Sequence, residues 1–554
     1  MGKAPTSTFL TMGNSPNKGG SGNRPLPVET AFRLPAPLPS WPPGNGFARG
    51  SINLGGLEVC QVSSFAKVWT TQEGGPDGLG ATFFKPSPVP SGFFVLGCYA
   101  QPNNKPLFGW VLVGRDVDGG ALQRPVDYTL VWSSVNSRIN KDGDGYFWVP
   151  TAPQGYRAVG LLVTSSPEKP SPEDIRCVRA DLTDVCENDG WVWGDNSGFN
   201  VSGLRPVSRG TQAAGVCVGT CTAQGTSSVL WCLKNNAPLA VAMPNTSQIE
   251  ALMQAYSPEV YFHPDEPYLP CSVGWFFDNG AVLYKKDDPT PAPIDSTGSN
   301  LPQGGSDDGA FWLDLPVDDG AKDRVKKGDL TSSEAYVHVK PMLGGTFTDL
   351  AVWLFYPFNG PARAKVKFIN IPFERIGEHV GDWEHVTLRV SNVTGELWRV
   401  FFAEHSSGAW VDASQVEFQQ GGNKPVAYSS LHGHAAYAKP GLVLQGDAKL
   451  GIGIRNDTAR GGSRIDTGAR YQLVAADYLG TVPGPPWTDY LREWGPKVSY
   501  DIAQEMKKVE KLLPRGLRKQ LEKVLSSLPA EVFGEEGPTG PKGKGNWAGD
   551  EVSS

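Results

Sequence analysis

The segment FKPSPVPSGFFVLG, residues 84–97, returns in altered form as WVPTAPQGYRAVG, residues 148–160, and as LRPVSRGTQAAG, residues 204–215. Each copy carries two glycines five residues apart, with a proline shortly before them. These glycines are Gly92 and Gly97, Gly155 and Gly160, and Gly210 and Gly215. Three copies predict three packed units that cannot bury their apolar faces alone, as in a pseudo-threefold β-prism. The alternative is that they are ordinary turns of a β-sandwich.

Length and composition point to several β-rich domains. The chain has 554 residues, including 67 glycines and 47 prolines. A single core rarely covers a chain of this length, and so many glycines and prolines favour turns and short strands over long helices. The formal net charge is -7. Because this charge does not attract polyanions, we expect no nucleic-acid partner.

The distribution of residue types divides the chain into five parts. Residues 1–30 and 531–554 are rich in glycine, serine and proline without periodicity, so a disordered arm and a disordered tail are expected there. Between them we predict a β-prism-like repeat domain over 31–245, a β-sandwich domain over 246–485 and amphipathic basic helices over 486–530. All seven histidines lie between His263 and His434, so imidazole chemistry is expected in the second domain.

The segment EHVGDWEHVTLRV, residues 378–390, is typical of a loop that enters a strand. Strand alternation places Asp382 and Glu384 on one inward face, and His385 and Arg389 on the other. Two unpaired carboxylates on that face would cost several kcal/mol, so they need a metal, an Arg or Lys, or a shared proton. With His379 nearby, an oxygen-rich set suits Mg²⁺, Ca²⁺ or Mn²⁺. The alternative is a salt-bridged strand end beside a buried arginine.

Four further histidines could frame the same pocket: His385, His405, His432 and His434. The alternative is that each is an isolated core or loop histidine. The sequence contains no GxSxG elbow, HExxH, Walker loop or strand-linked GxGxxG. A non-enzymatic role is therefore favoured. The alternative is a metal-dependent hydrolase, with Asp382 and Glu384 as metal ligands and one of these histidines as general base.

Residues 501–528 carry apolar side chains at helical spacing, broken at Pro514-Arg515-Gly516, which predicts a helix pair. The basic residues of this stretch are Lys507, Lys508, Lys511, Arg515, Arg518, Lys519 and Lys523. Such a face could rest on anionic lipid, where each basic residue contributes about 1 kcal/mol. The alternative is a helical hairpin docked on the β core with a solvated basic face.

Several long segments resemble the plant branch of the vacuolar protein sorting-associated protein 62 family. They are FRLPAPLPSWPPGNGFARGSINLGGLEVCQVSSFAKVWTT (32–71), GLRPVSRGTQAAGVCVGT (203–220), YFHPDEPYLPCSVGWFF (261–277), GDWEHVTLRV (381–390) and GPTGPKGKGNWAGDE (537–551). The likeness covers about 31–554. It implies a role in trafficking, with peripheral association with endosomal or vacuolar membrane. The expected compartment is the cytoplasm, because the N-terminal residues lack the apolar core of a secretory signal. The proline-glycine-aromatic repeat is also similar to adaptor-type repeats, which implies a protein adaptor as a partner.

A shorter resemblance concerns the second domain. The pattern His379-x-x-Asp382-x-Glu384 is similar to the GHRHDWE heptapeptide of necrosis- and ethylene-inducing-like proteins, although Gly381 replaces the second histidine. The segments AEHSSGAW (403–410) and KPVAYSSLHGHAAY (424–437) loosely resemble later strands of that family. This likeness implies a β-sandwich, a divalent cation on those three residues, and an anionic or glycosylated membrane lipid as partner. It also implies membrane permeabilisation in defence as an alternative function.

Overall fold

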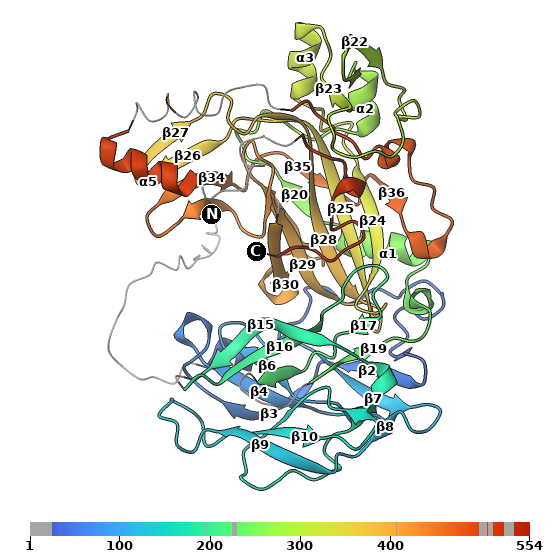
Figure 1. The fold of residues 1–554 in the computed structure, drawn as a ribbon, viewed down its shortest axis with the longest axis vertical. Helices are drawn as coiled ribbons and strands as arrows, with labels where there is room; N and C mark the ends of the chain where they lie inside the picture. Colours follow the sequence, from blue (N-terminus) through green and yellow to red (C-terminus); the bar gives the residue numbers. More distant parts are fainter. Residues whose placement is uncertain are drawn as a thin grey trace, which may run out of the picture.

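The computed structural model describes residues 25–195, 197–223, 230–405, 407–497, 507, 513–525 and 537–553. The chain forms two β-rich domains joined end to end, and its C-terminal end lies at their junction, beside β29 (Leu397–Glu404) and β30 (Ser407–Asp412) (Figure 1). The described part of the chain contains many small sheets and few helices. The prediction of a mainly β protein is confirmed.

Three units of similar strand order build the first domain. The first unit contains β1 (Ile52–Asn53), β2 (Leu57–Val62), β3 (Phe65–Thr70), β4 (Ala81–Pro86), β5 (Phe94–Val95), β6 (Tyr99–Pro102) and β7 (Val111–Asp116). The second contains β8 (Leu122–Gln123), β9 (Asp127–Ser133), β10 (Tyr146–Thr151), β11 (Tyr156–Arg157), β12 (Leu162–Thr164) and β13 (Cys177–Arg179). The third contains β14 (Thr183–Asp184), β15 (Cys186–Gly194), β16 (Asn200–Pro206), β17 (Gly215–Val216), β18 (Cys221–Ala223) and β19 (Cys232–Lys234). The sheets β3-β4-β6, β12-β10-β9 and β15-β16-β18 correspond to one another, as do β2-β7-β5, β11-β13-β8 and β14-β19-β17. The pairing order of the strands therefore repeats three times.

The three units approach one another closely at Gly97, Gly160 and Thr220. A Cβ added to Gly97 would lie 2.9 Å from the Cα of Gly160 and 2.6 Å from Cγ2 of Thr220. The first two glycines are thus needed because no side chain fits between these backbones. The residue of the third unit at this contact is Thr220, whereas a Cβ on Gly215, the glycine that the sequence pattern grouped with Gly97 and Gly160, would meet Pro206 at 2.6 Å.

A six-stranded sheet, with the order β30-β29-β28-β25-β24-β36, forms the centre of the second domain. Its other strands are β24 (Ala335–Met342), β25 (Phe347–Asn359), β28 (His379–Ser391) and β36 (Tyr471–Ala475). A smaller sheet of β20 (Glu259–Tyr261), β31 (Val426–Ser429), β32 (Ala436–Tyr437) and β35 (Arg464–Asp466), together with α1 (Thr246–Tyr256), shares an apolar core with it. Asn245 begins α1 with a capping box to Gln248, which satisfies free N–H groups at the helix start.

Two additions extend this domain (Figure 1). A lobe of α2 (Val273–Asp278), α3 (Asp319–Lys326), β21 (Val282–Lys285), β22 (Asp288–Pro293) and β23 (Phe311–Asp314) packs on a second apolar core. The second addition, here called the arm, is the sheet β27-β26-β34-β33 with α5 (Arg515–Leu525) packed on one face. Its strands are β26 (Arg363–Val366), β27 (Ile369–Pro372), β33 (Gly441–Asp447) and β34 (Ile452–Thr458).

The structure corrects two assignments in the C-terminal part. Residues 486–497 do not begin the basic helices, because Trp487 and Trp494 are buried in the core beneath the lobe. Residues 537–553, here called the C-terminal segment, are packed rather than disordered: Glu551 is 6% exposed, and the ring of Trp547 stacks on His338 at 3.9 Å. The predicted disorder of residues 1–24 lies outside the described residues. No described helix is long and apolar enough to cross a membrane.

Candidate functional site

The central strand β28 carries the residues that the sequence singled out, and its side chains alternate as predicted. Val386, Leu388 and Val390 enter the core shared with the smaller sheet. On the opposite face, His385 lies 3.1 Å from a carboxylate oxygen of Glu551. β28 therefore has two chemically different faces within one strand.

Asp382 is paired with a histidine that follows it by 52 positions. His434 Nδ1 donates to Oδ2 of Asp382 at 2.8 Å, and His434 Nε2 donates to the carbonyl of Tyr268 at 3.0 Å, with Glu266 Oε1 at 3.7 Å. Burial lowers the pKa of His434, but the bonds and charges of Asp382 and Glu266 outweigh burial and raise that pKa to about 10. Tyr356 stacks on the imidazole at 3.9 Å. At neutral pH, His434 is thus an imidazolium between two carboxylates.

This ion pair supplies the cation that the carboxylate of Asp382 requires. His379 Nδ1 donates to the carbonyl of Gly381 at 3.0 Å, and burial lowers the pKa of His379. Within the described residues, no group of three or more His, Cys, Asp or Glu side chains is arranged to hold a metal ion. The geometry at Asp382 therefore fits a salt bridge better than a metal centre, and the divalent cation at His379, Asp382 and Glu384 stays a prediction.

The other predicted pocket histidines lie in separate contacts. Their hydrogen-bond partners are Glu551 for His385 (3.1 Å), Asn456 for His405 (3.2 Å) and the carbonyl of Pro361 for His432 (2.8 Å). His385 is on the face of β28 that points away from Asp382. His434 uses both ring nitrogens as donors, so it has no lone pair with which to accept a proton. These positions do not support the general base that a hydrolase requires.

The predicted lipid-binding residues are only partly described. Arg515 begins α5, and Lys507, Lys519 and Lys523 are exposed. Arg518 donates from Nε to the carbonyl of Leu513 at 2.7 Å. Lys508 and Lys511 lie outside the described residues. The apolar side of α5 packs on the arm sheet through Leu517 and Leu521, with Leu513 just before the helix, as the docked-helix alternative expects.

The tips of the arm expose apolar side chains beside lysines. The turn between β26 and β27 presents Lys367 and Phe368, and Phe368 is 85% exposed. The neighbouring turn between β33 and β34 presents Lys449 and Leu450, and Leu450 is 46% exposed. The N–H of Lys367 donates to the carbonyl of Gly451 at 2.7 Å, so the two turns are joined. The sequence reasoning missed this surface because the two turns are more than 80 positions apart.

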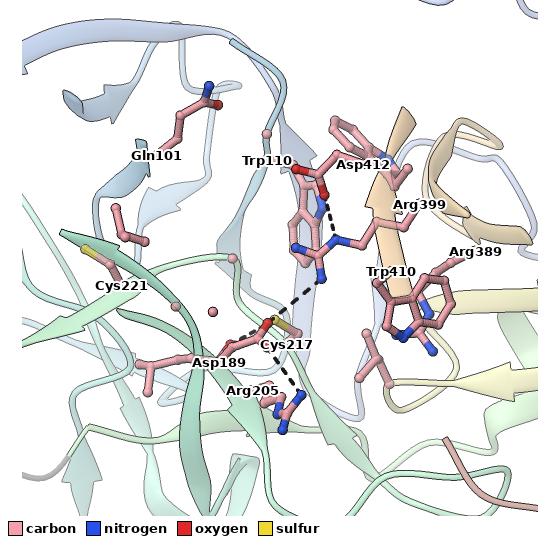
Figure 2. A pocket seen from close by; sticks show the side chains of 18 of the residues that line it. Gln101, Trp110, Asp189, Arg205, Cys217, Cys221, Arg389, Arg399, Trp410 and Asp412 are labelled. Atoms are coloured by element: carbon pink, nitrogen blue, oxygen red, sulfur yellow. Dashed lines mark hydrogen bonds and ion pairs between the residues drawn. The ribbon is translucent and has the colours of Figure 1, made fainter. Parts of the chain in front are cut away.

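A second candidate site is the cleft between the domains, a cavity of about 460 Å³ (Figure 2). Five cationic residues line it: Lys105, Arg205, Arg209, Arg389 and Arg399. Four acidic residues also line it: Asp189, Asp412, Asp550 and Glu551. Trp191 and Trp410 contribute aromatic surface. The volume and the mixture of aromatic and charged groups are those of a small-molecule site.

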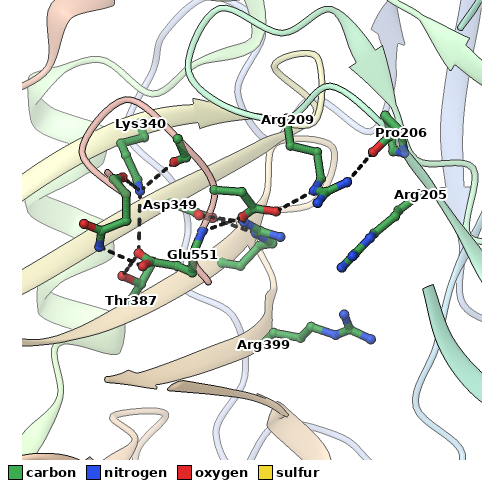
Figure 3. A network of polar contacts seen from close by, with 12 residues as sticks. Arg205, Pro206, Arg209, Lys340, Asp349, Thr387, Arg399 and Glu551 are labelled. Atoms are coloured by element: carbon green, nitrogen blue, oxygen red, sulfur yellow. Dashed lines mark hydrogen bonds and ion pairs between the residues drawn. The ribbon is translucent and has the colours of Figure 1, made fainter. Parts of the chain in front are cut away.

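Two of those acidic residues belong to the C-terminal segment (Figure 3). Asp550 bonds to Arg389 of β28 at 2.7 Å and to Arg209 of the first domain at 3.0 Å. Glu551 accepts from Thr387 at 2.7 Å and lies 3.5 Å from Nζ of Lys340. The segment therefore joins both domains through buried charges.

Comparisons with solved structures find partial likenesses. GNIP1Aa from Chromobacterium piscinae is 21% identical, with 35% of this chain and 40% of that chain covered and a TM-score of 0.26. The non-toxic HaNLP3 protein is 11% identical, with 43% and 78% covered and a TM-score of 0.22. Necrosis and Ethylene inducing Protein 2 from the agent of cocoa's Witches Broom disease is 14% identical, with 40% and 82% covered and a TM-score of 0.16. Overlaps this limited say nothing about function.

The family comparison covers much more of the chain. No curated protein matches it. The model of the vacuolar protein sorting-associated protein 62 family, however, matches residues 28–551, which include both domains, the arm and most of the C-terminal segment. The chain belongs to the vacuolar protein sorting-associated protein 62 family.

Proposed function

We propose that this chain is a non-enzymatic peripheral membrane protein of the vacuolar-sorting type, which docks on anionic lipid through the tips of its arm. The observation that carries the proposal is the pairing of Lys367 with Phe368 and of Lys449 with Leu450 on two joined turns. A side chain as large and as exposed as Phe368 is unfavourable in water and gains about 1.5–3 kcal/mol when buried. A bilayer surface offers that burial.

The charges around the tips favour anionic lipid. Lys365 lies on β26 next to the tip, which makes three lysines with Lys367 and Lys449. The one carboxylate at these turns, that of Asp447, accepts from the N–H of Leu450 at 2.9 Å. Each lysine near an anionic surface contributes about 1 kcal/mol. Exposed lysines of α5 on the same arm add to this charge.

Sedimentation with vesicles tests the proposal. Vesicles of phosphatidylcholine with phosphatidylserine should bind the protein, and binding should weaken as salt is raised because exposed charges are screened. Phe368→Ser should lower the affinity roughly tenfold to a hundredfold, the equivalent of the burial lost. A matched control is Val126→Ser, because Val126 is 65% exposed but lies in the first domain. Equal losses in both variants would contradict docking through the arm.

Vesicle assays also test the contribution of the lysine charge and whether binding permeabilises the membrane. Lys367→Glu should weaken binding to anionic vesicles by more than tenfold, whereas Lys286→Glu, an exposed lysine of the lobe, should have little effect. Vesicles that contain a dye should retain it while the protein is bound. Dye release would instead favour the permeabilising function that the shorter resemblance implies.

A further inference from the structure

The cleft between the domains already holds an anion, which comes from the chain itself. The carboxylate of Asp550 lies between two guanidinium groups, with Arg389 at 2.7 Å and Arg209 at 3.0 Å. Burial raises the pKa of Asp550, but Arg389 and Arg209 outweigh burial and hold that pKa below its usual value. Two arginines from different domains therefore hold this carboxylate, and each also pairs with a carboxylate of its own domain, Asp349 for Arg389 and Glu187 for Arg209. The guanidinium group matches the geometry of both carboxylate and phosphate oxygens.

The rest of the cleft has polar and aromatic groups that Asp550 does not use. Trp191 is 48% exposed, and Trp410 lines the cleft with Arg389 stacked 4.2 Å from its ring. A ring with hydroxyl groups would contact the aromatic faces of Trp191 and Trp410.

We infer that the cleft binds a phosphorylated polyol, with its phosphate between Arg209 and Arg389, and that Asp550 occupies the phosphate position until the ligand displaces it. Without Asp550 and Glu551, the lining would keep five cationic and two acidic residues, so the C-terminal segment lowers the positive charge of the cleft. Because the ligand must displace the segment, its apparent affinity for the cleft depends on the fraction of molecules in which the segment is released. The ligand could be soluble or the head group of a phosphorylated lipid. The inference does not depend on the membrane contact of the arm.

Calorimetric titration of the full chain with inositol 1,4,5-trisphosphate, and with unphosphorylated inositol as a control, tests this inference. The trisphosphate should bind and inositol should not. Asp550→Asn should strengthen binding about threefold to tenfold, because charged hydrogen bonds are roughly twice as strong as neutral ones and the segment competes less well. Arg209→Gln should weaken binding about tenfold or more. Arg179→Gln is the matched control, since Arg179 pairs with Asp181 on the exposed surface.

The two sources of ligand are distinguished by adding vesicles of phosphatidylcholine with a phosphatidylinositol phosphate. Tighter binding to these vesicles than to the soluble trisphosphate, lost in Arg209→Gln, assigns the head group as ligand; equal binding assigns a soluble compound. If Arg209→Gln does not fold, the tighter binding of the trisphosphate that is expected for Asp550→Asn still tests the inference. The inference is wrong if Asp550→Asn binds no trisphosphate, or if it binds the trisphosphate no more tightly than the native protein does.

Discussion

The imidazolium of His434 gives the sharpest prediction, because its charge is held between Asp382 and Glu266. His434→Asn is the perturbation that disturbs the backbone least. His434 has a positive φ of 54°, which asparagine adopts more readily than most residues, and the new amide can still donate to Asp382. The substitution therefore removes the charge and the bond to Tyr268 while it keeps the local turn.

The size of the effect follows from the raised pKa of His434, about 10 against an ordinary value near 6.5. A raised folded-state pKa contributes stability that is fully present below the unfolded pKa and is lost as the pH rises through the folded value. The contribution is about 5 kcal/mol below pH 6, and about 3 kcal/mol of it is lost between pH 6 and pH 9. His434→Asn leaves two buried carboxylates without their cation, so it should cost about 3–5 kcal/mol near pH 6 and much less near pH 9.

Two measurements check this. Urea unfolding at several pH values gives the free energy of unfolding of both proteins, and their difference should shrink as the pH rises. Histidine labelled with ¹³C at Cε1 gives seven resonances, and the one missing in His434→Asn should not titrate between pH 5.5 and 8.5. A His434 resonance that titrates near pH 6.5, or a stability difference independent of pH, would refute the ion-pair reasoning.

Three further predictions follow. Millimolar Ca²⁺ should not raise the melting temperature above that in EDTA, whereas a bound ion at hundredfold excess over Kd would add about 2.7 kcal/mol. Glu551→Gln should lower the free energy of unfolding by about 3–5 kcal/mol, measured by urea unfolding, because it leaves Lys340, with a side chain 1% exposed, without its carboxylate. Gly97→Ala should cost about 1–3 kcal/mol in the same assay, because the added methyl would lie 2.6 Å from Thr220.

Each of these has its control. A calcium-dependent rise in melting temperature that Asp382→Asn abolishes would support the predicted metal site instead of the ion pair. Glu168→Gln changes an exposed glutamate and should be neutral, so an equal loss there would contradict the role of Glu551. Gly190→Ala places a methyl where no atom lies within 4 Å, and it should therefore be tolerated.

Local sequence patterns predicted those features that depend on near neighbours. The alternation along β28 follows from the pleat of a strand, and the close approach at Gly97 and Gly160 follows from a repeat in which both glycines recur. The contact residue of the third unit is Thr220, which the glycine pattern could not identify because it pointed to Gly215. A recurring residue type predicted the close contact only where the backbones leave no room for another residue.

Long-range pairing could not be predicted in the same way. Strand alternation predicted that Asp382 needs a metal, an Arg or Lys, or a shared proton, but nothing near it in the sequence identified His434 as its partner. The C-terminal segment was assigned to disorder because glycine and proline dominate its composition. The signals that could have placed it are Trp547, an aromatic residue in an otherwise polar segment, and the adjacent acidic pair Asp550-Glu551.

The charges on the second face of β28 explain why that acidic pair matters. Arg389 already has a carboxylate within its own sheet, since Asp349 binds it through two hydrogen bonds of 2.8 Å. Asp550 is therefore a second carboxylate on one guanidinium, and Arg209, which also pairs with Glu187, reaches it from the first domain. Burying Asp550 without Arg209 would leave an excess negative charge in a partly desolvated site. Packing of the C-terminal segment and packing of the two domains against each other consequently stabilise one another. A ligand that displaces Asp550 therefore also removes the ion pair of Asp550 with Arg209, one of the contacts that hold the domains together.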